Sequence, residues 1–370
     1  MLDFLPDFLR TPLAFLIVLG VLVFIHELGH YIAARWCGVH VEIFSIGFGR
    51  AIASWTDRVG TVWKVAWLPL GGYVKLHGLE QPEDVSAEVK ATWQAGRTFH
   101  EKRVGARAVV VAAGPVANFL LAVVLFAALF ATAGRGIAIP VVGEVISGSA
   151  AAAGGLHKGD RIEAIDGAPI ARFEDIQRAV AASPGRPLHL MVASGGADHA
   201  VTVTPTAQQS GGRTIGVLGI KGGAVEYQRL PLWQALPAGF AETWDITSQT
   251  LAGVWAMIAH DQGTAELGGP LRIAQLSGQV AQLGLASVVS FIAMLSVNLG
   301  LINLFPIPML DGGHLLFYLV EVVRGRPLPK RAVELGFRAG LALLAGLFVF
   351  ATWNDLTHIG IFHWVAGLMG

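Results

Sequence analysis

The chain has 370 residues, of which 54% are hydrophobic and 14% are charged, whereas soluble domains carry about 25% charged residues. This composition excludes an ordinary soluble enzyme and predicts a membrane protein with at least one aqueous domain. Lysine plus arginine and aspartate plus glutamate balance at 26 each, so there is no basic excess to bind phosphates and we expect no nucleic-acid partner.

Four stretches are long and apolar enough to cross a bilayer, which takes roughly 20 helical residues. They cover residues 13–34, 104–133, 283–304 and 337–353. Lysines and arginines concentrate in the loop after the first stretch and in the loop before the fourth, and loops of this kind face the cytoplasm. We therefore expect four transmembrane helices, with both termini and the region 134–282 on the outer face.

The first stretch contains the motif His26-Glu27-Leu28-Gly29-His30. Residues four apart share one face of a helix, so both imidazoles can reach one metal ion while Glu27 addresses a bound water. Catalytic zinc commonly takes three protein ligands and leaves a fourth position to water, so one ligand is still missing. A proton relay or ion path in a transporter uses the same residue types and is the alternative interpretation.

The outer region predicts a small mixed α+β domain. Strands are expected over 141–146, 188–192, 200–204 and 214–220, and a helix over 173–182. The segment 155–167 resembles the signature of PDZ domains, in which a tight turn leads into a strand and then an Asp-Gly turn. PDZ domains bind extended peptides by strand addition, so this resemblance implies a polypeptide partner. A small β domain with no binding role is the alternative.

The segment 232–259 mixes aromatic and aliphatic residues with Glu242, Asp245 and Pro237. Charged side chains and a proline are unfavourable inside a membrane helix. We therefore expect an amphipathic helix on the membrane surface rather than a fifth span.

The third metal ligand is expected near the inner end of the third span. Pro306 and Pro308 should break the helix there, which places Asp311 on irregular backbone that can turn toward the first span. We predict Asp311 as the third ligand, with His314 as its rival. Asn298 and Asn303 are polar groups in an apolar helix, and they either hydrogen-bond a substrate backbone or tie helices together.

Taken together, the HELGH motif, the sequence Ala-Gly-Pro-Val-Ala-Asn-Phe over 113–119, the PDZ signature and the segment 303–313 resemble the site-2 protease family. The similarity is closest to its bacterial branch that cleaves membrane-bound anti-sigma factors. It implies an α-helical polytopic membrane protein with about four transmembrane helices, a membrane-reentrant β-loop over 47–76 and one inserted α+β PDZ domain. An ordinary hairpin on the membrane surface is the alternative for 47–76. The best-known bacterial members carry two tandem PDZ domains, and here only one copy is recognisable.

The resemblance implies an intramembrane zinc metalloendopeptidase. It implies one Zn²⁺ per chain bound by His26, His30 and Asp311, with Glu27 as the catalytic residue. The implied substrate-binding residues are Gly47, Phe48, Gly49, Gly71, Gly72, Tyr73, Asn298, Asn303 and Pro308.

The implied location is the bacterial inner membrane, with the PDZ domain in the periplasm and the active site toward the cytoplasmic half. The implied partners are the lipid bilayer, a single-pass membrane substrate (an anti-sigma factor or a signal-peptide remnant) and an upstream site-1 protease. We expect a first half of the protease core over 1–136, the PDZ domain over 137–222, a membrane-surface connector over 223–282 and the second half of the core over 283–370. The alternatives are an inactive PDZ scaffold and, disfavoured by the lack of an inverted repeat, a secondary transporter.

Overall fold

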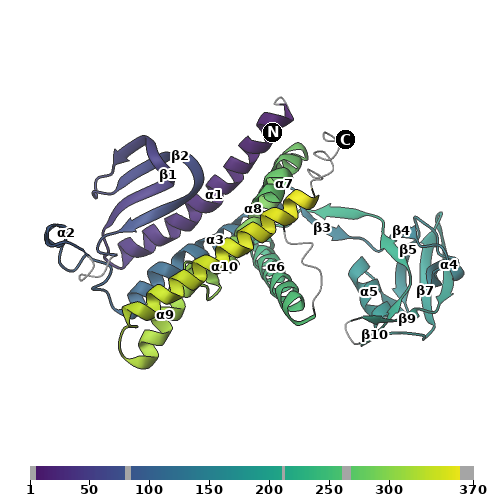
Figure 1. The fold of residues 1–370 in the computed structure, drawn as a ribbon. Coiled ribbons are helices and arrows are strands. Elements are labelled where there is room, and N and C mark those ends of the chain that lie inside the picture. The colour runs from purple at the N-terminus through teal and green to yellow at the C-terminus, as the bar shows by residue number, and fades with distance from the viewer. Residues whose placement is uncertain (1–5, 80–84, 211–212, 261–267, 359–370) are drawn as a thin grey trace, which may run out of the picture. The chain divides into compact units, whose positions relative to one another are not determined.

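The computed structural model describes residues 6–79, 85–210, 213–260 and 268–358. The chain divides into two compact units (Figure 1). One is mainly helical and comprises Met1–Leu129 and Leu232–Gly370, and the other is β-rich and comprises Phe130–Pro231. The β-rich unit is therefore inserted between two parts of the helical unit.

Within the residues that the structure describes, four helices are long and apolar enough to cross a membrane, and they cover Phe8–Trp36, Val104–Thr132, Leu285–Leu304 and Lys330–Thr357. These stretches confirm the four predicted ones, although the fourth helix begins earlier than its apolar run because the basic residues before it are also helical. The helices of this unit are α1 (Asp7–Trp36), α2 (Ala87–Ala91), α3 (Val104–Thr132), α6 (Leu232–His260), α7 (Pro270–Gln282), α8 (Leu285–Leu304), α9 (Asp311–Arg324) and α10 (Lys330–His358).

Helix α6 forms one continuous element where the amphipathic segment is predicted. It packs against α8, and at Gly239 it approaches α3 so closely that a Cβ would lie 2.6 Å from the Val123 carbonyl oxygen. Its other face leaves large side chains exposed, among them Trp233, Phe240 and Trp255. That α6 lies on the membrane surface stays a prediction.

Strands β1 (Val41–Thr56) and β2 (Val62–Leu76) are both bent, so that two strands form a sheet of four segments. Segment 41–46 pairs with 72–76 on one side and with 62–65 on the other, and 51–56 pairs with 62–66. Segment 72–76 is thus one edge of the sheet. The bend at Gly71, with φ +108°, is open to glycine alone. The sheet lies against α1, where the buried Phe44 meets the rings of Phe24 and Tyr31 at 5.7 and 5.9 Å.

The β-rich unit is a small α+β domain built on a four-stranded sheet of order β6-β5-β7-β8. Its core includes Ile162, Ile176, Leu190 and Val192, all buried. The predicted strands and helix are confirmed within a few residues. The elements are β3 (Arg135–Ala138), β4 (Val142–Val145), α4 (Ala150–Ala153), β5 (Arg161–Ile165), β6 (Ala168–Pro169), α5 (Phe173–Ala181), β7 (Leu188–Ser194), β8 (Ala197–Val203), β9 (Thr206–Ser210), β10 (Arg213–Val217), β11 (Ile220–Gly222) and β12 (Val225–Gln228).

The first and last strands of this unit, β3 and β12, pair with each other in antiparallel fashion, with Ala138 opposite Val225 and Arg135 opposite Gln228. Neither strand is evident from the sequence pattern. Because of this pairing, the chain enters and leaves the β-rich unit at one place.

Candidate metal centre

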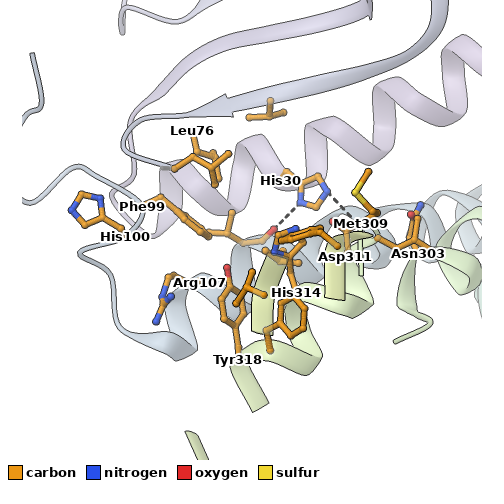
Figure 2. Close-up of a pocket in the computed structure, with 18 of the residues that line it drawn as sticks. His30, Leu76, Phe99, His100, Arg107, Asn303, Met309, Asp311, His314 and Tyr318 are labelled. Carbon is orange, nitrogen blue, oxygen red and sulfur yellow. Dashed lines mark hydrogen bonds and ion pairs between the residues drawn. The ribbon is translucent and has the colours of Figure 1, made fainter. Parts of the chain in front are cut away.

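Three potential metal ligands from two distant parts of the chain converge. The Nε2 atoms of His26 and His30 lie 3.2 and 3.5 Å from Oδ2 of Asp311 and 3.2 Å from each other. Figure 2 shows His30 directed toward Asp311. Within the part of the chain that the structure describes, these residues form the one group of three or more His, Cys, Asp or Glu whose ligand atoms come together in this way.

The local backbone structure explains how each of the three ligand residues is positioned. His26 and His30 are one helical turn apart on α1. After α8 the chain runs irregularly to Leu310, and Asp311 is the first residue of α9. The sequence predicts Asp311 on irregular backbone, and the structure corrects this, because the irregular segment ends one residue earlier. Gly313 allows the start of α9 to fold back closely, since a Cβ there would lie 2.6 Å from Pro308 Cα.

Helix α3 contacts both imidazoles at Nδ1, the ring nitrogen that does not face Asp311. Nδ1 of His30 lies 2.8 Å from the backbone oxygen of Val110, and Nδ1 of His26 lies 3.2 Å from the side-chain amide of Asn118. A carbonyl oxygen can only accept a hydrogen bond, so Nδ1 of His30 carries a proton, and in the neutral ring its Nε2 keeps the lone pair that a metal ion can bind. Sequence reasoning did not give these supporting residues a role.

The spacing of the three atoms fits a zinc ion. Zinc bonds nitrogen and oxygen ligands at about 2.0–2.2 Å in tetrahedral geometry, which separates neighbouring ligand atoms by about 3.3 Å. The three separations here are 3.2, 3.2 and 3.5 Å. In addition, Oδ2 of Asp311 is buried without an ordinary hydrogen bond from the described residues. The donor set therefore fits a zinc ion with a fourth position left open.

The ligands line a cavity of about 770 Å³. Glu27, Tyr73 and Asn303 also line it, so three of the residues predicted for catalysis or substrate binding share the space with the ligands. The carboxylate of Glu27 is hydrogen-bonded by the backbone amide of Val74, at the edge of the sheet. Gly72 adjoins the same carboxylate, since a Cβ there would lie 3.2 Å from Glu27 Cγ.

The other predicted substrate-binding residues lie elsewhere. Asn298 accepts a hydrogen bond of 3.2 Å from the hydroxyl of Thr250 on α6, which is a contact between helices. Pro308 packs against α10 at Gly340. The remaining four, all in the bent sheet and none among the cavity-lining residues of the described chain, are Gly47, Phe48, Gly49 and Gly71.

His314, the rival for the third ligand, lines the same cavity but does not join the ligand group. Its ring packs on Phe337, with centroids 5.4 Å apart. Burial lowers the pKa of the His314 imidazole, which favours its neutral form.

An ion pair, formed by Arg107 and Glu321, also lines the cavity. Arg107 on α3 donates to Glu321 on α9 at 2.6 Å, and both side chains are largely buried. The guanidinium lies over the ring of Tyr318, 4.9 Å from its centroid, and burial raises the pKa of Tyr318 to about 12. In Figure 2, Arg107 and Tyr318 lie below His30. The pair ties α9, which carries Asp311, to the helix that supports the two histidines.

Comparison with known proteins supplies the context of this site. The sequence pattern of Peptidase family M50 matches residues 14–347. A protein of Agrobacterium fabrum named "Putative zinc metalloprotease Atu1380" is 42% identical, covering 93% of this chain and 95% of its own. The "Metalloprotease MmpA" of Caulobacter vibrioides is 37% identical, covering 98% and 99%, and the "Regulator of sigma-E protease RseP" of Salmonella typhimurium is 31% identical, covering 94% and 98%.

Proposed function

The chain belongs to peptidase family M50, the site-2 proteases, and from this premise we propose that it is an intramembrane zinc endopeptidase. The proposed reaction is hydrolysis of a peptide bond within or near the transmembrane segment of a single-pass membrane protein. The observation that carries the proposal is the convergence of His26, His30 and Asp311 beside Glu27 in one cavity of an apolar helical unit.

The proposed chemistry assigns separate tasks to these residues. His26, His30 and Asp311 would hold one zinc ion per chain, and zinc in such a site supplies a Lewis acid that polarises a carbonyl and makes water more acidic. Glu27, which is not a ligand, takes the proton from the attacking water and passes it to the leaving amine. Asn303, which lines the cavity, would hydrogen-bond the substrate backbone.

Substrate presentation is proposed to use the sheet edge. A transmembrane helix satisfies its own backbone hydrogen bonds, so cleavage requires local unwinding. The amide of Val74 points toward Glu27 and hence away from segment 41–46. Backbone groups alternate along a strand, so Gly72 presents its amide and carbonyl to the same side. An unwound substrate could pair with this edge next to Glu27, which fits the role of a membrane-reentrant β-loop.

The β-rich unit is proposed to be a PDZ domain that acts on substrate access. An apolar groove between α5 and the strands β10 and β11, lined by Phe173, Ile176, Val180, Val217 and Ile220 among others, has a volume of about 370 Å³. Such a groove suits an extended peptide.

The proposed cellular setting follows the same family. By family resemblance the protein would lie in the bacterial inner membrane. The positive-inside rule would then orient it with both termini and the PDZ domain in the periplasm and the metal centre toward the cytoplasmic half. Its proposed substrates are an anti-sigma factor or a signal-peptide remnant already trimmed by an upstream site-1 protease. The name of the Salmonella relative, a regulator of sigma-E protease, supports the first of these.

The proposed function is tested by separating metal binding from proton transfer. We expect Glu27→Gln to abolish cleavage of a membrane-embedded substrate while the purified chain keeps one zinc, because this carboxylate acts on water. His26→Ala, His30→Ala and Asp311→Ala should lose zinc as well as cleavage. Zinc is measured by elemental analysis and cleavage by immunoblot in cells. If Asp311→Ala kept full zinc occupancy, the third ligand would have to be reassigned to His314. Cleavage by Glu27→Gln would refute the mechanism.

A further inference from the structure

The side chain of Asn118 is wholly buried, at 0% exposure, next to the metal-ligand histidines. Its Nδ2 lies 3.2 Å from Nδ1 of His26. Its Oδ1 is buried and has no hydrogen-bond partner among the described residues. The two ends of a primary amide have nearly the same shape, so the chemistry of the neighbouring ring has to decide which end faces His26.

The tautomer of His26 decides which end of the amide faces the ring. A metal binds an imidazole through the lone pair of one nitrogen, and the other nitrogen then carries the proton. Nε2 of His26 faces both Nε2 of His30 and the carboxylate of Asp311, so Nε2 is the ligand atom and Nδ1 carries the proton. An NH₂ group cannot accept that proton, whereas the amide oxygen can.

The opposite orientation would prevent metal binding. If Nδ2 donates to Nδ1 of His26, the ring proton must sit on Nε2, between the three ligand atoms. A half-turn of the amide exchanges oxygen and nitrogen without changing its shape. This half-turn brings the amide oxygen to the Nδ1 proton and frees the Nε2 lone pair, while the NH₂ group takes the former position of the oxygen.

We propose that Asn118 is a positioning residue of the metal centre, whose amide oxygen accepts a hydrogen bond from Nδ1 of His26 and keeps the Nε2 lone pair free to bind the metal ion. The inference rests on the proposed function, because it concerns binding of the zinc ion. Val110 does the same for His30 through its backbone oxygen. Both histidines thus receive their orientation from α3, and only at His26 does it depend on a side chain that mutation can change.

Asn118 also has a contact that has nothing to do with the metal. The hydroxyl of Ser296 on α8 donates to the backbone oxygen of Asn118 at 2.8 Å. Ser296 is itself buried. Ser296→Ala is therefore a matched control, because it perturbs the packing of Asn118 between helices without touching the amide.

The test compares Asn118→Leu, which has a similar shape and no acceptor, with Asn118→Asp, which can accept but cannot donate. Each full-length chain is purified in detergent, stripped of metal and titrated with zinc against a chromophoric chelator. Thermal unfolding of the metal-free chain is measured in parallel. We expect Asn118→Leu to bind zinc about 10- to 100-fold more weakly, as loss of such supporting partners does elsewhere. Asn118→Asp and Ser296→Ala should bind at least as tightly as the unmodified chain.

The outcomes distinguish failure of the proposed role of Asn118 from failure of the proposed zinc site. Unchanged zinc affinity in Asn118→Leu, or a loss in Asn118→Asp equal to that in Asn118→Leu, would overturn the role of the amide oxygen. A Leu variant whose metal-free chain is destabilised while its zinc affinity holds would make Asn118 a helix tie only. If Asn118→Leu does not fold, Asn118→Asp decides alone, since a donor role predicts its failure. An unmodified chain that binds no zinc would refute the metal centre itself.

Discussion

Gly114 shows how little space the centre leaves for side chains. It lies on α3 between Val110 and Asn118. A Cβ added there would run into Nε2 of His30 and would lie 2.6 Å from its Cε1 and 2.9 Å from Cε1 of His26. Real Cβ atoms do not approach other atoms so closely, so the two imidazoles could not both keep their places. The absence of a side chain at this position is thus a requirement of the ligand geometry.

We therefore predict that Gly114→Ala weakens zinc binding and abolishes cleavage, although alanine is the better helix former by about 1 kcal/mol. The matched control is Gly20→Ala on α1, where a Cβ would have nothing within 4 Å. That variant should keep both zinc and activity. Zinc content by elemental analysis and helix content by circular dichroism are the measurements. A Gly114→Ala chain that holds zinc as well as the control would contradict the prediction.

The residues of the metal centre differ in how well their roles can be predicted from the sequence. His26, Glu27 and His30 share one helical turn, so spacing alone predicts their common face. Asp311 could be proposed because prolines and glycines mark a helix break. Asn118 and Val110 could not be assigned a role, because their contacts cross between helices at separations of 92 and 80 residues. No local periodicity encodes how two apolar helices are rotated against each other.

At the scale of elements, the sheet edge at 72–76 is the feature with the most direct bearing on catalysis. Val74 lies on this edge and, among the described strands, is paired with Phe44 alone, whereas Val65 lies inside the sheet and is paired with both Ile46 and Ala53. Proline lacks the amide proton and is tolerated at edges but not in the interior of a sheet. Proline substitutions at Val74 and Val65 therefore distinguish loss of pairing at the edge from loss of the whole sheet.

We predict that Val74→Pro keeps the fold and the zinc but loses capture of substrate. Because the Val74 amide also contacts Glu27, the test is made in a Glu27→Gln background, where chemistry is already absent. Capture is measured by photocrosslinking of a membrane-embedded substrate to the purified chain. Val65→Pro should instead destabilise the whole protein. If Val74→Pro captured substrate normally, strand addition at this edge would be excluded.

Elements and their contacts also differ in predictability. Hydropathy predicts the four long helices because burial in lipid requires continuous apolar stretches. The double pairing of β1 and β2 was not predicted, since it depends on bends at glycines such as Gly71 rather than on alternation. The pairing of β3 with β12 joins residues about 90 positions apart, and such long-range pairs leave no signature in one short segment.

At the scale of the whole molecule, the chain combines a helical unit that holds the metal ligands with an inserted β-rich unit that contributes none of them. A part in the chemistry is therefore not expected of the inserted unit. By family resemblance we propose that it filters substrates, admitting those whose bulky outer portion has already been removed. Exclusion by size would need no energy source, because a folded domain can obstruct a large ectodomain while a short stub passes.

The pairing of Ala138 with Val225 allows this unit to be removed cleanly. Opposite residues of an antiparallel pair lie about 5 Å apart, and an Asn-Gly dipeptide closes such strands in a tight turn. Replacing residues 139–224 by Asn-Gly should therefore leave β3 and β12 as a hairpin, without strain on α3 or α6. A version with a long flexible linker in place of the turn controls for an effect of the turn itself.

We predict that the hairpin variant cleaves a pre-trimmed substrate as the full chain does, and that it also cleaves an untrimmed one, which the full chain should spare. Both substrates are followed in cells by immunoblot, with Glu27→Gln as the inactive control and with zinc content measured on the purified variant. The opposite result is equally informative. If the variant inserts and holds zinc but no longer cleaves the trimmed substrate, the groove beside α5 delivers substrate to the metal centre and the filter is refuted. Substitution of groove residues such as Ile176 or Val217 by charged ones should then reproduce that loss, whereas a filter that works by size would not depend on the lining of the groove.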